Sequence, residues 1–128
     1  MIGDIINREI VSVGLSFTEV LNSVLEGAEF DCFELKDREF ALEICRIIAE
    51  VFILPENTSI LMGGNSYPIH TVQDVYEQLT YEHIARVIDN FKEINYPIKK
   101  KKAYIRTALY NSVFEYETGI ENEYRTYR

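Results

Sequence analysis

Apolar residues recur at helical spacing over much of the chain, and the most regular stretch follows Thr80. There the apolar positions share one face of a helix and the polar positions share the other, which predicts an amphipathic helix. Its apolar face consists of Ile84, Val87, Ile88, Phe91 and Ile94. Thr80 is placed to cap the start of this helix, and Pro97 ends it.

A last helix is predicted from about Lys99 to about Tyr116, after a link of about four residues that contains Asn-Tyr-Pro. Its expected buried face is Tyr104, Ile105, Ala108 and Leu109. Gly119 suggests where it stops. Because the link is short, we expect these two helices to pack against each other.

Three further helices precede this pair. The first is predicted over roughly 17–26, between a capping Ser16 and Gly27. A long one runs from Asp37 to about Leu54, and its apolar stripe is wide enough to be covered on more than one side. A short one follows Thr71 as its cap. We expect the helix after Asp37 and the helix after Thr80 to form the core.

Two segments lack helical periodicity. Glu29 to Lys36 alternates phenylalanine with polar residues, which fits a short strand or an extended connector. Thr58 to Ile69 predicts a β-hairpin that turns at Gly63-Gly64-Asn65, with Pro68 restricting its second strand to an edge. The predicted fold class is therefore mainly α, a bundle of four to five helices with one small β-hairpin.

The domain organisation follows from the same pattern. Residues 1–15 fit a loose helix or a linker, 16–118 form one helical domain, and 119–128 form a polar tail that frays. A chain of 128 residues with 47% hydrophobic content suits one domain with a real core.

Composition excludes several classes of protein. No apolar run approaches the roughly 20 residues that span a bilayer, and no secretory signal is evident, so we expect a cytoplasmic protein without membrane contact. Cys32 and Cys45 lack metal-ligand spacing and fit reduced packing residues. His70 and His83 fit solvated or capping residues. With no nucleophile, metal or dinucleotide motif, we expect no enzyme, no catalytic residues, no cofactor and no metal site.

The charge distribution points to a candidate binding site. The net charge is −8, and residues 1–98 hold 17 acidic and 6 basic residues, yet residues 99–106 hold five bases and no acid. Lys99, Lys102, Arg106 and Tyr110 fall on one helical stripe, flanked by Lys100 and Lys101 and interleaved with Tyr104.

Cations at the start of a helix oppose its dipole and repel each other, so this cluster needs an anion. The anion could come from the domain's own acids, from a phosphate or from an acidic protein surface. The sequence leaves three interpretations open: a solvated face, a nucleic-acid contact with tyrosine stacking platforms, and a contact with an acidic protein.

Residues Lys102 to Asn111, KAYIRTALYN, resemble the K-A-Y-L-x-T-A-L-Y-N signature of RepA-type plasmid replication initiators of Gram-positive bacteria. Glu82 to Asp89, EHIARVID, resembles the family's S-E-H-I-x-Y-V-L-D segment. Weaker likeness extends back to Val24. The likeness covers only the C-terminal domain of those proteins, which is similar to that of DnaD-type primosome proteins. In this chain Tyr104 and Ala108 take the first two positions of their Y-x-x-x-I/L-x-x-W/Y motif, and Tyr110 lies one residue before its final aromatic position.

The resemblance implies an accessory domain of a replication initiator. It implies binding of primosome proteins, either helicase loader or primase, and of single- or double-stranded DNA as a further partner. The site residues expected from charge and resemblance together are Lys99, Lys100, Lys101, Lys102, Tyr104, Arg106 and Tyr110. The alternative is an oligomerisation or protein-interaction module that does not bind nucleic acid, with a homo-oligomer as one form.

Overall fold

The structure is a computed structural model that describes the backbone of residues 1–12 and 14–126 and the side chains of residues 1–9, 11 and 14–115. This part is mainly helical with one two-stranded antiparallel sheet, so the predicted fold class is confirmed. The helices are α1 (Arg8–Ser12), α2 (Phe17–Gly27), α3 (Arg38–Ile53), α4 (Ile69–Tyr76), α5 (Tyr81–Lys92) and α6 (Lys101–Thr126).

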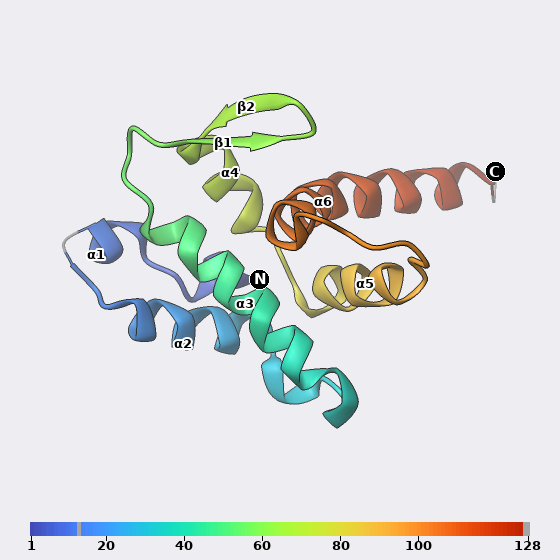
Figure 1. The fold of residues 1–128 in the computed structure, drawn as a ribbon, viewed down its shortest axis with the longest axis horizontal. Coiled ribbons are helices and arrows are strands. Elements are labelled where there is room, and N and C mark those ends of the chain that lie inside the picture. Colours follow the sequence, from blue (N-terminus) through green and yellow to red (C-terminus); the bar gives the residue numbers. More distant parts are fainter. Residues whose placement is uncertain (13, 127–128) are drawn as a thin grey trace.

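Helix α3 runs through the middle of the molecule and contacts each of the five other helices (Figure 1). The apolar stripe of α3 is as wide as predicted. Helix α2 packs on one side of it, and α4, α5 and α6 pack on the other (Figure 1). The buried residues of α3 are Ala41, Ile44, Cys45, Ile47, Ile48, Ala49, Val51 and Phe52. The core therefore joins α3 to α5 as expected, and α2 adds a second layer beneath it.

The hairpin consists of β1 (Ser59–Met62) and β2 (Asn65–Pro68). Met62 pairs with Asn65, so Gly63 and Gly64 form a two-residue turn with φ of +58° and +83°. Positive φ at both central positions is what such turns require and what glycine permits. Ile60 and Met62 point into the core, whereas Leu61 points outward and is 68% exposed.

Two local predictions upstream of α5 are wrong. Helix α4 begins at Ile69 and not after a Thr71 cap, because Ile69 is fully buried and its N–H donates to Thr58 O at 2.9 Å. The segment 29–36 contains neither a strand nor an extended connector but two 3-10 turns, Phe30–Cys32 and Leu35–Asp37. Glu29 adopts a left-handed conformation, with φ of 54°, that turns the chain at this point.

The boundaries of the last two helices also differ from prediction. Helix α5 ends at Lys92, so the link spans residues 93–100, twice the expected length. Helix α6 continues through Gly119 to Thr126 and extends beyond the body of the molecule (Figure 1). A glycine costs a helix only about 1 kcal/mol relative to alanine, which is too little to end it here. Within the predicted tail, residues 127–128 and all side chains lie outside the described part.

The first residues pack on the domain, although the sequence pattern allowed a linker. Ile2 is fully buried, and its N–H donates to Leu79 O at 2.9 Å. Gly27 makes room for this contact, because a Cβ atom there would lie 2.7 Å from Ile2 Cα. The N-terminal segment thus packs against α2 and against the short segment between α4 and α5.

Candidate interaction site

The basic residues that the sequence singled out gather at the start of α6, but not all of them on the helix. Since α6 begins at Lys101, Lys99 and Lys100 lie in the preceding link. Lys102, Arg106 and Tyr110 follow one another at intervals of four along α6. The predicted four-residue helical stripe is therefore wrong at Lys99, because the helix starts two residues later than expected.

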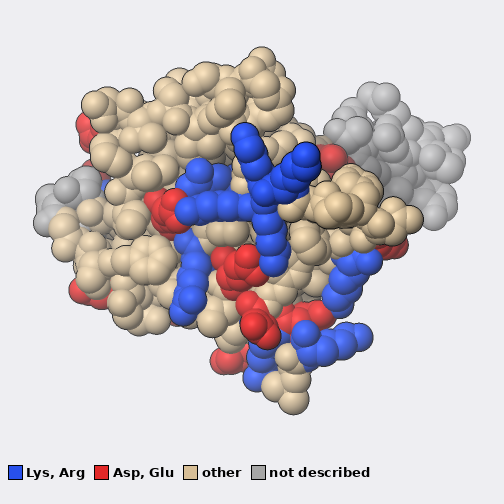
Figure 2. All heavy atoms as spheres, in the orientation of Figure 1, with Lys and Arg blue, Asp and Glu red and all other residues tan. Residues whose placement is uncertain are grey.

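Two carboxylates of α3 form ion pairs with three of the five cations of this cluster. Lys102 Nζ lies 2.6 Å from Glu50 Oε2, and Arg106 Nη2 lies 2.8 Å from Glu50 Oε1. Lys101 Nζ lies 3.0 Å from Glu43 Oε2. Figure 2 shows the result, with acidic side chains lying among the basic ones on this face. Of the anion sources that the sequence left open, the domain's own acids therefore serve three of the five cations.

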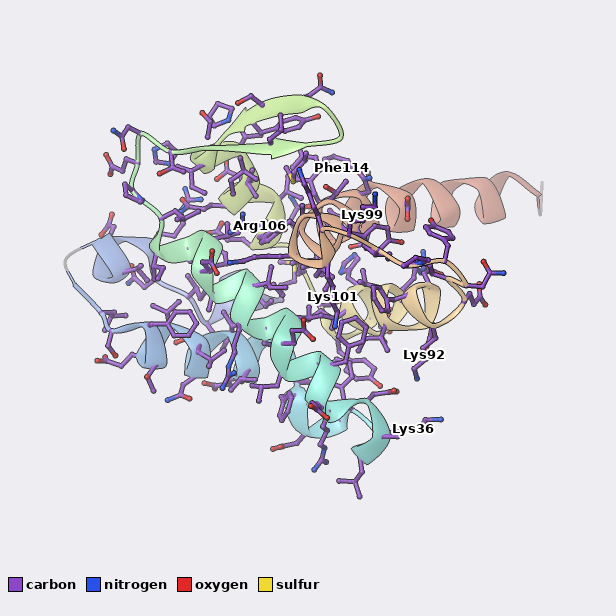
Figure 3. The ribbon with its side chains drawn as sticks, in the orientation of Figure 1. Lys36, Lys92, Lys99, Lys101, Arg106 and Phe114 are labelled. Atoms are coloured by element: carbon purple, nitrogen blue, oxygen red, sulfur yellow. The ribbon has the colours of Figure 1, made fainter. Side chains whose placement is uncertain are left out.

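Arg106 is the most enclosed member of the cluster. Its side chain is 19% exposed, and its backbone carbonyl accepts a hydrogen bond from the Tyr76 hydroxyl at 2.8 Å. Burial raises the pKa of Tyr76, and the nearby Arg106 charge partly opposes that rise. Arg106 therefore joins α6 to α3 through its side chain and to α4 through its backbone carbonyl (Figure 3 labels its position).

The two tyrosines are packed against other rings. The Tyr104 ring centroid lies 6.0 Å from that of Phe91, and Lys101 Nζ lies 5.5 Å from the Phe91 centroid. The ring centroid of Tyr110 lies 5.2 Å from that of Tyr67 on the hairpin. Burial raises the pKa of Tyr110, and the electrostatic effect of Tyr67 raises it further. Both tyrosines are half-buried, so they fix α6 to its neighbours and are not open stacking platforms.

Lys99 and Lys100 differ from the rest. Both are exposed, and neither forms an ion pair with a described carboxylate. Lys100 lines a hollow of about 590 Å³ between α3, β1 and α6. The hollow is lined mainly by Glu50, Leu54, Ile60, Leu61, Lys100, Lys101, Lys102, Ala103 and Arg106.

Sequence reasoning missed three residues of this site: Glu43, Glu50 and Leu61. A signal for the first two was present, because residues seven apart on a helix share a face, and Glu43 and Glu50 are seven apart on α3. Leu61 gave no signal, since a single apolar residue in a strand can point to either side of the sheet.

The histidines and cysteines occupy separate places. His83 Nδ1 accepts a hydrogen bond from the Thr80 N–H at 3.0 Å and closes the cap of α5, whereas His70 is exposed at the start of α4. Cys45 is buried as predicted, but Cys32 is exposed because it ends a surface 3-10 turn. The described residues hold no group of three or more His, Cys, Asp or Glu arranged for a metal ion. None of their helices has the length and apolar content to cross a membrane.

Comparison with family models, with curated proteins and with solved structures finds no match to this chain.

Proposed function

We propose that this chain is a cytoplasmic interaction domain of a plasmid-type replication initiator, and that it binds a protein of the primosome, either a helicase loader or a primase. The observation on which the proposal rests is the pair Lys99 and Lys100, two adjacent exposed cations without a described carboxylate partner, of which Lys100 lines a hollow. The resemblance of Lys102 to Asn111 to replication initiators supplies the biological setting.

The ion pairs favour a protein partner over DNA. A nucleic-acid backbone is bound by many cations at once, and here Glu43 and Glu50 already form ion pairs with three of the five. Two exposed lysines suit a few carboxylates on a protein surface. Tyr104 and Tyr110 are engaged with Phe91 and Tyr67, which leaves their faces poorly placed for stacking on bases.

The test measures DNA binding against salt concentration. If only Lys99 and Lys100 contact phosphate, the slope of log K against log salt on duplex DNA is about −2, and binding is weak. If all five cations do so, the slope is about −4.5. The second result would restore DNA as the main ligand.

The protein partner is tested with the charge-reversed variant K99E/K100E in a pull-down from a bacterial lysate treated with nuclease. We expect the wild type to retain a helicase loader or primase and the variant to lose it. The matched control is K36E, because Lys36 is an exposed lysine far from the hollow's lining. Retention by the double variant equal to that of the wild type contradicts the proposal.

A homo-oligomeric module is the second candidate. It is favoured by the extension of α6 beyond the body and by Phe114, which is 47% exposed on that helix (Figures 1 and 3). Sedimentation of the wild type and of K99E/K100E separates the candidates. A wild-type dimer that the charge reversal dissociates supports the oligomeric module, whereas a monomer in both removes it.

A further inference from the structure

The hollow between α3, β1 and α6 combines an apolar wall with a basic rim. Leu61 is 68% exposed on the outward face of β1, and it lines the hollow together with Leu54, which directly follows α3. Lys100, from the link before α6, also lines it. An aliphatic side chain this exposed on a hairpin gains free energy when a partner covers it.

The charges of the hollow do not cancel. Among the described residues that line it are four cations, Lys100, Lys101, Lys102 and Arg106, and a single carboxylate, Glu50. Glu43 pairs with Lys101 from outside the lining. Even when its charge is included, the positive charges outnumber the negative ones. Lys102 and Arg106 share the single charge of Glu50, and Lys101 pairs with Glu43. Lys100 and the neighbouring Lys99 form no ion pair with a described carboxylate, so these two lysines are the cations most open to a partner.

We propose that this hollow binds an acidic protein segment that contains an aliphatic residue. The aliphatic side chain packs against Leu61 and Leu54, and carboxylates on either side of it pair with Lys99 and Lys100. This inference rests on the proposed function, and it names the chemistry of the protein partner and the place where that partner docks.

Nucleic acid fits the hollow less well. None of the described side chains that line it is aromatic, so this lining offers no ring on which a base could stack. An exposed leucine gives no recognition to a phosphate backbone. The combination of a leucine and two lysines matches a segment of alternating acidic and aliphatic residues, with charge complementarity across its rim.

The test uses fluorescein-labelled peptides and the full chain. The probe is a peptide of repeating Asp-Glu-Leu-Leu, and the comparison peptides are repeating Asp-Glu-Ser-Ser and repeating Asn-Gln-Leu-Leu. Oligothymidylate serves as the nucleic-acid probe. The variants are L61S and K100E, and the matched control is L35S/K36E, since Leu35 is 80% exposed and lies outside the hollow. Circular dichroism checks that each variant folds.

We expect the Asp-Glu-Leu-Leu peptide to bind, and each comparison peptide to bind at least about tenfold more weakly. L61S and K100E each lower the affinity by about tenfold, and L35S/K36E leaves it unchanged. The inference is overturned if the probe does not bind, if L61S binds as the wild type does, or if oligothymidylate binds more tightly through Lys100.

The two proposals can fail separately. If K99E/K100E abolishes retention of the replication protein while L61S does not alter it, the partner binds the lysines without entering the hollow, and only this inference fails. If neither change affects retention, the proposed function fails as well.

Discussion

Glu50 binds two cations of α6 at once, and Arg106 is the more enclosed of the two. A partly buried carboxylate that serves two cations cannot be removed without leaving charge with poor solvation. Glu43 and Lys101, by contrast, are each more than 40% exposed and form a single surface pair. At the scale of single residues, the ion pairs of Glu50 and the ion pair of Glu43 should therefore contribute differently to the stability of the fold.

We expect E50Q to lower the free energy of unfolding by about 1–2 kcal/mol, because Arg106 loses its carboxylate partner in a partly dry site. The matched variant E43Q should cost less than about 0.5 kcal/mol, since exposed ion pairs contribute little. Urea denaturation of both variants measures the difference. Equal losses in the two variants would show that Glu50 has no special role.

The two cysteines should differ in reactivity. Burial raises the pKa of the Cys45 thiol to about 12, while Cys32 is exposed. Native protein should therefore react with a thiol reagent at Cys32 alone, and Cys45 should react only after denaturation. The variant C32S is the control, because it should show no native reaction at all.

The same raised pKa predicts a loss of stability in alkali. Because the folded state holds the Cys45 proton more tightly than the unfolded state does, the stabilisation is fully present below about pH 9. It falls as the pH rises from about 9 towards 12, by up to about 1.4 kcal/mol per pH unit. Urea denaturation of the wild type and of C45A over this range should show the steeper decline in the wild type.

At the scale of elements, the hairpin presents Leu61 only because its register holds. Met62 pairs with Asn65 across the two-glycine turn, and a shift by one residue would turn Leu61 inward and Met62 outward. The turn is thus what decides which side chains line the hollow.

The turn predicts a difference between its two glycines. Gly64 has φ of +83°, so G64V should destabilise the protein by about 1–3 kcal/mol, because β-branched residues rarely adopt positive φ. G63N should be close to neutral, since φ at Gly63 is +58° and asparagine tolerates the left-handed region. Urea denaturation checks both, and a G64V protein as stable as G63N would contradict the turn geometry.

At the scale of the whole molecule, the N-terminal segment completes the core. Ile2 is fully buried beside Gly27, and Ile5, three residues later, is 38% exposed. The first residues of the chain therefore pack against α2 and against the segment before α5, and Ile2 is part of the same continuous core as the helices.

We expect I2A to lower the free energy of unfolding by about 2–5 kcal/mol, as truncation of a buried isoleucine generally does. The matched variant I5A should cost less than about 1 kcal/mol, because its side chain is partly in solvent already. Denaturant unfolding measures both values. A negligible effect of I2A would indicate that the N-terminal segment behaves as a linker.

Local pattern alone determined the helices α2 and α3, the start of α5 and the hairpin, whereas α5 ends at Lys92, earlier than Pro97 indicated. Each has a strong periodicity or turn signal between clear boundaries, such as Ser16, Pro55 and Gly63-Gly64, so short-range physics was sufficient. The buried side of α6 also followed from spacing, as Ile105 and Leu109 are fully buried. Where the boundary signal was weak, at Thr71 and Gly119, packing and helix propensity led to a different result.

Only the tertiary structure decided what the cations of α6 do. The sequence places Lys102 and Arg106 more than fifty residues from Glu50, and no local pattern states that α3 and α6 meet with these side chains opposed. Likewise, the outward direction of Leu61 depends on which face of the hairpin is covered. Pairing of distant charges and choice of face are long-range properties, and they exist only once the core has assembled.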